Sequence, residues 1–351
     1  MEGSLERIRA MFAHRKPDRI PLYELIRNDA VVKHFTGRDL TPENAEEVLY
    51  ETFPKAVDTT RSIRRPSHEN DEILPDGRRR LTRRWTIWTE HVKYASSEAY
   101  AEAKRAALAK PMDTWTKEDQ AGIERHLANL RELRRRLGPN FFHFAGGPSL
   151  GLMGIMGEVG VEAFCYYLAD YPDVMDLQLE WHMVRSILWL EHLPKDHGLE
   201  AVFTGDDIAF KNGPFLSPAW FREHYMPRFK PIMEAYHRRG ILANFHSDGN
   251  LMPIMDQLVE AGIDMLNPIE VAAGMDIAEL HRRYPALIFT GGIDVSGLLP
   301  FGAPEEVRDA TVKAIEDAEG QIMIGSSTEL HNHVPLANFL AMRQAALDYR
   351  L

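Results

Sequence analysis

Residues 240–249 read GILANFHSDG, and the rest of the chain repeats the pattern that they set. The apolar residues Ile241, Leu242 and Ala243, followed by Phe245, come directly after a glycine, as is typical of a short buried strand. The run ends in His246, Ser247 and Asp248. Such polar side chains are costly to bury unless they have partners or a function. Because ligands of parallel α/β folds bind at the carboxyl ends of strands, this stretch predicts a strand that ends in a functional site.

Strand-like and helix-like segments alternate from about residue 140 to the end of the chain, which predicts parallel strands joined by right-handed crossovers. The other late strands are NFFHFAGGPSL (140–150), which runs into a glycine turn, AVFTGDD (201–207), MLNPIE (265–270), LIFTGGID (287–294) and QIMIGSS (321–327). With the segments 19–24 and 57–63 the chain offers about eight strands, which favours a single (β/α)₈ TIM barrel over residues 1–351. An open, doubly wound α/β sheet is the alternative.

Two segments interrupt the alternation, and a helical segment at residues 4–15 precedes it. Residues 64–98 alternate charged and apolar side chains around the turn Pro75-Asp76-Gly77, which predicts an inserted β-hairpin. Residues 99–138 predict a helical excursion. The hairpin carries five arginines, and it is either a solvated edge or an electropositive lip that attracts a substrate carboxylate. These arginines are Arg78, Arg79, Arg80, Arg83 and Arg84.

Composition excludes several classes of function. The net charge of −11 argues against nucleic acid or an anionic membrane as the main partner. Cys165 is the only cysteine, so the chain has no internal disulfide and no multi-thiolate zinc site; we expect it to pack in the core. No apolar run approaches ~18 residues and the N-terminus is charged, so we expect a cytoplasmic protein without a membrane span. No glycine-rich phosphate-binding turn follows a strand.

In a barrel, the side chains at the strand ends converge on one mouth, and here they are mostly acidic. Clustered carboxylates repel one another and raise their own pKa values, and a divalent cation such as Zn²⁺ relieves the repulsion. Each residue also has a structural alternative. In the structural alternative, His246 only hydrogen-bonds to a neighbouring carboxylate. One of Asp206 and Asp207 would then only cap the turn that follows it, and Asp294 would likewise only cap a turn. The segment His331-Asn-His333 is either a metal site or, in the structural alternative, a surface loop without a ligand.

Several segments together resemble the uroporphyrinogen decarboxylase superfamily. They are RKPDRIPLYE (15–24), GDDIAFKNGPFLSPAWFREHYMPRFKPIMEAYHRRG (205–240), NFHSDGNLMPIMDQLVEAGIDMLNPIE (244–270), FTGGIDVSGLLPFGAPEEVRD (289–309) and IGSSTELHNHVPLANFLAM (324–342). The likeness extends over residues 4–30 and about 140–350. It implies a (β/α)₈ barrel and a homodimer. The superfamily contains cofactor-free decarboxylases and also metal-dependent methyltransferases that work with a corrinoid protein or a thiol.

The chain departs from both branches at the residues that matter. Of the decarboxylase's N-terminal arginine motif only Arg27 is kept, and the position of its late histidine falls near Thr328. Ser217 does match a substrate-contacting serine of that branch. The methyltransferases carry His-x-Cys where this chain has His246-Ser-Asp248. A carboxylate in place of the thiolate makes a harder metal site, which suits an oxygen ligand better than a thiol.

The resemblance therefore implies a metal-dependent methyltransferase of the O-demethylase type. It would bind Zn²⁺ and move a methyl group from a small methoxylated substrate to a corrinoid carried by a partner protein. The alternatives are a cofactor-free decarboxylase of tetrapyrrole carboxylates and a non-catalytic subunit of a corrinoid complex. The expected catalytic residues are Asp207, His246 and Glu270. Expected substrate contacts are Glu24, Arg27, Ser217, Asn267 and Asp294. Expected metal ligands are His246, Asp248, Glu329 and His331.

Overall fold

Parallel strands form the centre of the molecule, which a computed structural model describes over residues 3–350. Six of them pair in the order β14-β13-β12-β11-β8-β7. Their bounds are β7 (Ala145–Gly146), β8 (Ala201–Gly205), β11 (Leu242–His246), β12 (Met265–Ile269), β13 (Ile288–Ile293) and β14 (Ile322–Ser326). The order follows the sequence, as expected when each strand is joined to the next by a crossover.

Short parallel pairings connect the two ends of this sheet. Strand β2 (Thr59–Thr60) pairs with β6 (Phe142–His143), which leads directly into β7. Parallel bridges join Leu22 to Ile324 of β14, and Tyr23 to Thr59 of β2. The parallel pairings thus run in a ring around eight segments, and the predicted (β/α)₈ barrel is confirmed.

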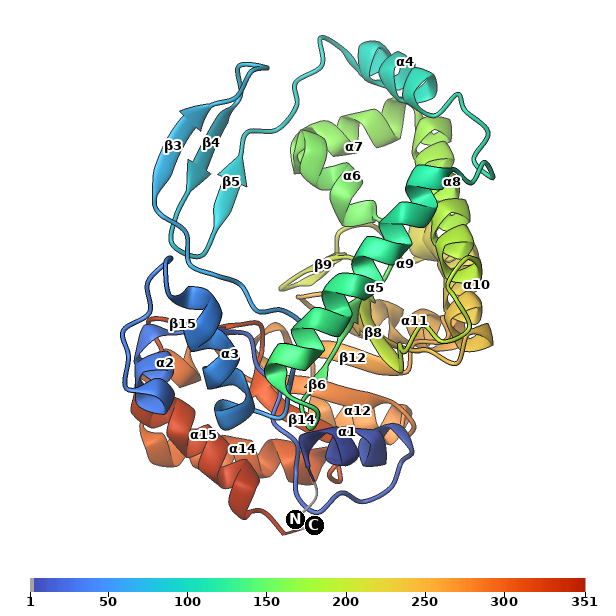
Figure 1. Ribbon diagram of the computed structural model, residues 1–351. Helices are drawn as coiled ribbons and strands as arrows, with labels where there is room; N and C mark the ends of the chain where they lie inside the picture. The colour runs from blue at the N-terminus through green and yellow to red at the C-terminus, as the bar shows by residue number, and fades with distance from the viewer. Residues whose placement is uncertain (1–2, 351) are drawn as a thin grey trace.

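Helices surround the barrel (Figure 1). Those that follow the strands are α2 (Asp29–Thr36), α3 (Ala45–Ala56), α8 (Pro172–Glu191), α9 (Pro218–Trp220), α10 (Met226–Arg238), α11 (Met255–Ala261), α12 (Ile277–Arg283), α13 (Leu298–Phe301), α14 (Pro304–Asp317) and α15 (Leu336–Asp348). Shorter turns are the π-helical η1 (Phe221–Tyr225) and the 3₁₀ helices η2 (Met252–Ile254) and η3 (Val271–Ala273). Small strand pairs are β1 (Ile26–Arg27) with β15 (Leu330–His331), and β9 (Ala209–Phe210) with β10 (Gly213–Pro214).

Helix α1 (Ser4–Phe12) covers one end of the barrel, where both chain termini lie (Figure 1). Its Ile8 and Met11 share a buried cluster with Leu242, Met265 and other residues that point into the barrel. Buried Asp58 fastens this helix, because it accepts hydrogen bonds of 2.7 Å from both Arg7 and Arg19.

Two arms rise from the opposite end of the barrel (Figure 1). One is an antiparallel sheet of β3 (Asn70–Ile73), β4 (Arg79–Thr82) and β5 (Ile87–Thr89), one strand more than the predicted hairpin. Its five arginines all pair with carboxylates, which favours the solvated edge over the electropositive lip. The other arm is helical, with α4 (Ser97–Ala107), α5 (Lys117–Leu137), α6 (Leu152–Val159) and α7 (Val161–Asp170).

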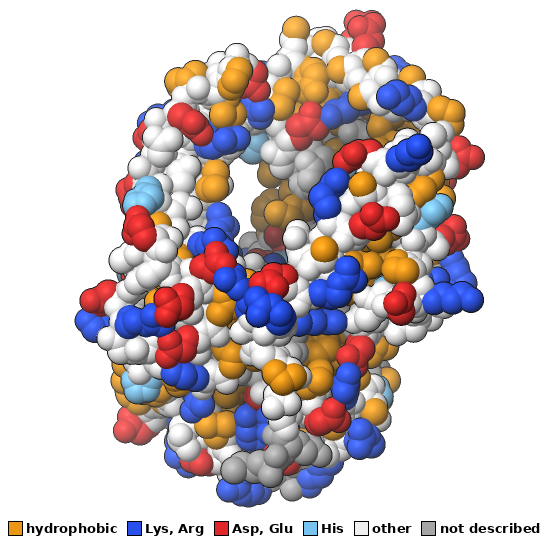
Figure 2. Space-filling view, in the orientation of Figure 1, with side chains coloured by type: hydrophobic (Ala, Val, Ile, Leu, Met, Phe, Trp, Pro, Cys, Tyr) orange, Lys and Arg blue, Asp and Glu red, His pale blue; other side chains and the backbone are white. Residues whose placement is uncertain are grey.

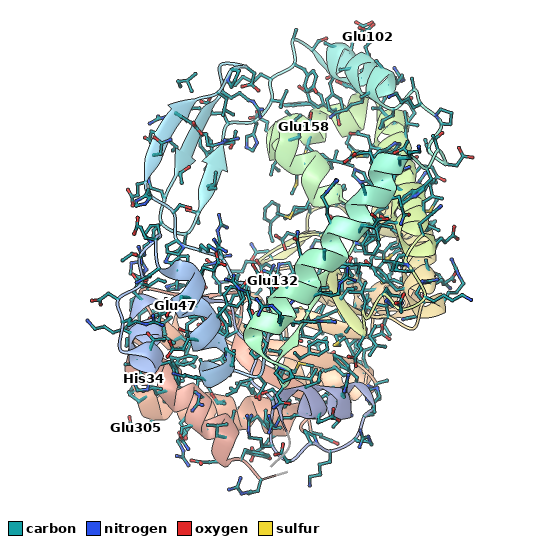
Figure 3. The ribbon with its side chains drawn as sticks, in the orientation of Figure 1. His34, Glu47, Glu102, Glu132, Glu158 and Glu305 are labelled. Atoms are coloured by element: carbon teal, nitrogen blue, oxygen red, sulfur yellow. The ribbon has the colours of Figure 1, made fainter. Side chains whose placement is uncertain are left out.

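The space between the arms is open in the space-filling view (Figure 2). The segment that follows β5 bonds to the helical arm at Glu158 of α6 (labelled in Figure 3), because the Val92 N–H donates to the Glu158 carbonyl at 2.7 Å and the Tyr94 hydroxyl donates to its carboxylate at 3.0 Å. The expectation that Cys165 packs in the core was wrong, since it is exposed on α7. Within residues 3–350 no single helix has the length and apolar composition of a membrane span, and only the bent pair α6 and α7 does so jointly.

We predict that Asp58→Ala lowers the free energy of unfolding by about 3–5 kcal/mol, because it leaves the buried Arg7 without one of its carboxylate partners. Arg9→Ala is the matched control, since its ion pair with Glu200 is half-exposed and should contribute less than about 1 kcal/mol. Urea denaturation of both variants measures the difference. Equal costs would show that Asp58 does not fasten α1.

Candidate metal centre at the barrel mouth

The pleat of β11 points His246 into the barrel. Phe245 packs outward, with its ring centroid 5.2 Å from that of Phe229 on α10, and alternate residues of a strand face opposite sides. Leu242, Asn244 and His246 therefore point inward. On the neighbouring strand, Gly205 lies opposite His246, and a Cβ there would come within 2.2 Å of the His246 carbonyl oxygen. Only glycine lets β8 approach so closely.

Two neighbours fix the ring of His246. Its Nδ1 lies 3.0 Å from Oδ1 of Asn267, to which it donates, and its Nε2 lies 3.2 Å from Oδ1 of Asp207. Because Nδ1 bonds Asn267, Nε2 is the ring nitrogen that faces the carboxylates: it donates to Asp207 when it carries a proton, and in the neutral ring with the proton on Nδ1 its lone pair is available to a metal. Metal-binding histidines are commonly oriented in this way, by a hydrogen bond from the ring nitrogen that does not bind the metal.

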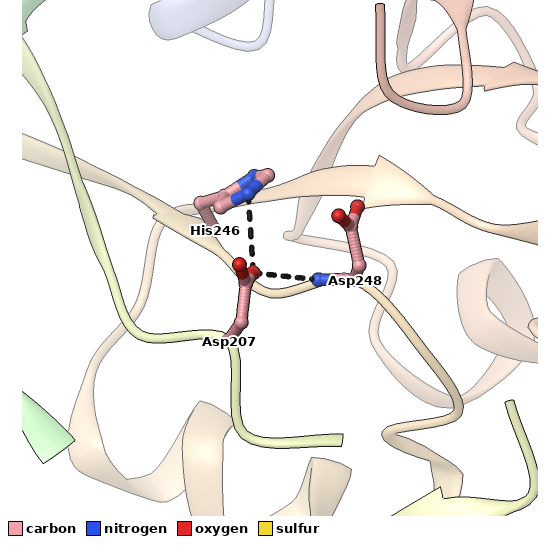
Figure 4. A group of neighbouring side chains, drawn as sticks. All are labelled: Asp207, His246 and Asp248. Carbon is pink, nitrogen blue, oxygen red and sulfur yellow. Dashed lines mark hydrogen bonds and ion pairs between the residues drawn. The ribbon is translucent and has the colours of Figure 1, made fainter. Parts of the chain in front are cut away.

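Asp207 and Asp248 complete a triad with His246 (Figure 4). Each of the three offers one ligand atom, and these atoms all lie within 4.8 Å of one another. Asp207 accepts the Asp248 backbone N–H at 3.1 Å, and Asp248 accepts the Thr328 hydroxyl at 3.2 Å. One imidazole and two carboxylates form a donor set that fits Zn²⁺, and three protein ligands leave a position open for substrate.

The two carboxylates of this triad differ electrostatically. Burial raises the pKa of Asp207, but the hydrogen bond and charge of His246, together with Asp248 N–H and Arg61, outweigh it, and the pKa lies below its ordinary value. The pKa of Asp248 is raised, mainly because the carboxyl is buried, and the nearby charges of Asp207 and Glu270 raise it further. Repulsion among these carboxylates is what a cation at the triad would relieve.

Other buried carboxyls have structural partners. Asp206 accepts the backbone N–H groups of Gly151 and Met153 at the start of α6, and the Tyr225 hydroxyl at 2.9 Å. Burial raises its pKa to about 6. Glu24 accepts the Ser326 N–H at 2.9 Å and its hydroxyl at 2.7 Å, and burial raises the pKa of Glu24 to about 7. Of the pair Asp206 and Asp207, Asp206 is the one that holds a turn.

The structure places some predicted site residues at the triad. Glu270 accepts the Gly249 N–H at 2.7 Å, and its charge reaches Asp248. Asn267 holds His246, while its own amide nitrogen is buried without a hydrogen-bond partner.

Other predicted residues lie apart from the triad or bond elsewhere. Arg27 and Glu329 form an ion pair with each other. His331 uses both ring nitrogens, one toward the Val295 carbonyl and one toward the His333 N–H. Ser217 is exposed and caps α9, and Asp294 accepts three backbone N–H groups of its own turn.

Sequence reasoning missed Arg61. It follows β2, and its guanidinium carbon lies 4.1 Å from the centroid of the Phe203 ring, which in turn lies 5.0 Å from the His246 ring centroid. The same strand-end rule that found His246 would have found Arg61. However, β2 is only two residues long and gives little alternation to read.

Comparisons with known proteins agree with this fold. A family model described as Uroporphyrinogen decarboxylase (URO-D) matches residues 92–349. The Methylcobamide:CoM methyltransferase MtbA of Methanosarcina mazei is 22% identical to this chain over 207 residues. The match covers 58% of this chain and 58% of the length of that curated relative. A solved methyltransferase from Methanosarcina mazei has a TM-score of 0.69 over 99% of each chain at 15% identity, which shows a shared fold.

We predict that Tyr225→Phe destabilises the protein by about 1–3 kcal/mol, because it removes a donor from a buried carboxylate. The pKa of Asp206 is already raised above that of an unfolded aspartate, and the variant raises it further. A carboxyl with a raised folded pKa loses stability as the pH rises through that pKa. The cost should therefore be larger at pH 8 than at pH 5.

Tyr236→Phe is the matched control for this measurement. Its hydroxyl donates to the Pro148 carbonyl at 2.7 Å, and a carbonyl does not titrate. Thermal or urea unfolding at both pH values should show a cost that is independent of pH for Tyr236→Phe. If Tyr225→Phe behaves in the same way, Asp206 does not change its charge in this range.

Proposed function

Because the chain belongs to the uroporphyrinogen decarboxylase (URO-D) family and its curated homologue is a methyltransferase, we propose that it is a metal-dependent methyltransferase. In the proposed reaction it moves a methyl group from a small methoxylated substrate to a corrinoid carried by a partner protein. The observation that carries this proposal is the triad of Asp207, His246 and Asp248 at the barrel mouth. Its two oxygen donors and one nitrogen donor suit an ether oxygen as the further ligand.

The chain's own residues prepare the proposed site. Asn267 fixes which nitrogen of His246 faces the carboxylates, the Asp248 N–H orients Asp207, and the Thr328 hydroxyl orients Asp248. Such preorganised ligands hold an ion without rearranging first. When bound, a divalent ion supplies a Lewis acid for the oxygen that loses its methyl group. In the proposed transfer the C–O bonding pair would stay on that oxygen, and the electron pair of the new bond to the methyl group would come from the corrinoid of the partner protein.

The remaining expected residues take different parts in the proposal. In the proposal Glu270, whose charge reaches Asp248, passes a proton to the substrate oxygen after the methyl group has left it. Arg27, which pairs with Glu329, is kept as a proposed substrate contact, whereas Glu24 is fully buried with both oxygens hydrogen-bonded, so the proposal gives it no direct part. Ser217 and Asp294 are bonded into a helix cap and a turn, so the proposal gives them no direct part. Asp207 takes the ligand position that Glu329 and His331 were expected to fill.

We propose that a corrinoid-carrying partner reaches the mouth through the open space between the two arms. The relative's name specifies a methylcobamide, which is a corrinoid. In this chain the two arms leave an open space at the carboxyl ends of the strands (Figures 1 and 2). A cofactor presented by another protein needs such access, because it must enter and leave without unfolding the barrel. The homodimer implied by the family resemblance remains a prediction that light scattering can measure.

We predict that protein purified without chelator holds about one equivalent of a divalent ion, such as Zn²⁺, per chain, and that His246→Ala holds less than about a tenth of that. Removing an imidazole ligand takes away one of three protein donors, so affinity should fall at least about 100-fold. Elemental analysis after dialysis measures the metal content. Methyl transfer from a methoxylated aromatic to free cob(I)alamin measures activity in parallel.

His331→Ala is the matched control, since its ring nitrogens are already bonded within the loop. It should keep the metal. Less metal than a tenth of an equivalent in the parent protein, with no gain on adding zinc, would contradict the metal centre. Conversion of uroporphyrinogen to coproporphyrinogen would favour the decarboxylase instead.

A further inference from the structure

Positive charge gathers beside the triad without a carboxylate partner among residues 3–350. Neither Arg61 nor Arg64 forms an ion pair there, whereas Arg27 pairs with Glu329. Burial lowers the pKa of Arg27, and the charges of Arg64 and Arg61 add to this effect, so Arg61 and Arg64 each lie within electrostatic reach of Arg27. An unpaired arginine pair in an acidic protein points to an anion that the chain itself does not supply.

Arg61 is the member of this pair that faces the reacting centre. It stacks on Phe203, Phe203 contacts His246, and the charge of Arg61 reaches Asp207. Stacking on an aromatic ring fixes the plane of a guanidinium group and leaves its edge free to bind two oxygens of one carboxylate. A group held by that edge would lie next to the triad.

Other donors around Arg61 also lack acceptors. The Nε of Arg61 is buried without a hydrogen-bond partner, and so are the Tyr23 hydroxyl and the Asn267 amide nitrogen. Arg61 and Asn267 lie close enough to Tyr23 to lower its pKa, although burial raises it more, yet neither makes a well-formed hydrogen bond with the hydroxyl. Buried donors without acceptors are costly, and such groups commonly serve a ligand.

We propose that Arg61, with the Tyr23 hydroxyl beside it and Arg64 at the rim, binds a carboxylate of the substrate. The substrate is then a methoxylated carboxylic acid, with its acid group at Arg61 and its ether oxygen at the triad. This assignment rests on the proposed function, because a cation at the triad neutralises Asp207 and Asp248 and leaves Arg61 without a counter-charge. Without a cation, the charge of Asp207 would weaken carboxylate binding at Arg61, but Arg61 would still have no ion-pair partner among the described residues.

Binding measurements with matched probes test this assignment. The probes are 3-methoxybenzoate and 4-methoxybenzoate, each paired with its uncharged methoxybenzamide, and titration calorimetry gives each Kd. In the parent protein at least one benzoate should bind at least tenfold more tightly than its amide. Arg61→Met should abolish that preference and leave the amide affinity unchanged. Arg61→Lys keeps the positive charge but cannot form the bidentate hydrogen bonds of a guanidinium group, so this variant should bind the benzoate with intermediate affinity.

Arg308→Met is the control for the change in net charge, because Arg308 is exposed on α14, away from the mouth. It should bind both probes like the parent protein. Equal affinity of the parent for benzoates and amides, or an unchanged preference in a folded Arg61→Met, would overturn the proposal. Carboxylate binding that depends on Arg61 in a protein without metal or methyl transfer would uphold this subsite and refute the proposed function, so the two failures are distinguishable.

Discussion

The alternation of β11 is the constraint on which the site depends. Burying Phe245 against Phe229 turns the next residue, His246, toward the barrel interior, and the register with β12 sets it opposite Asn267. The same register sets Gly205 on its other side. A shift of one residue would bury the imidazole among the outer helices and turn a phenylalanine into the mouth. Core packing and site geometry are thus fixed by the same side-chain pattern.

The carboxylates at the barrel mouth differ in the number of hydrogen-bond donors that surround them. Asp206 and Glu24 are buried, but backbone N–H groups and hydroxyls satisfy their oxygens, so they hold segments of the fold together. Asp207 and Asp248 receive fewer such bonds and face one another across His246. A carboxylate whose oxygens all accept hydrogen bonds can serve a purely structural role, whereas two carboxylates that face each other need a cation or a shared proton to relieve their repulsion. This difference separates the fold from the chemistry more clearly than burial does.

The barrel and the central residues of the candidate site could be predicted from the sequence, because both depend on the periodicity of apolar side chains and on where the strands end. The run before His246 and the strand before Asp207 are long enough to show their direction. Glu329 and His331 were harder to place, because their loop forms its own strand pair with β1 and turns those side chains toward local partners. Arg61 was overlooked because β2 is very short. Helix α6 was missed although Leu152, Ile155, Met156 and Val159 recur at helical spacing, because glycine is a poor helix former and Gly154 and Gly157 interrupt the segment.

Charge balance connects the acidic triad to the arginines. Asp207, Asp248 and Glu270 bring three negative charges to the mouth, and Arg61 and Arg64 bring two unpaired positive ones. A dication alone would leave one positive charge in excess, and a carboxylate alone would leave two negative ones. A dication together with a substrate that carries one carboxylate brings the sum to zero. In the proposed assignment both together fit these charges best, and a substrate without an acid group would leave the buried Nε of Arg61 without an acceptor.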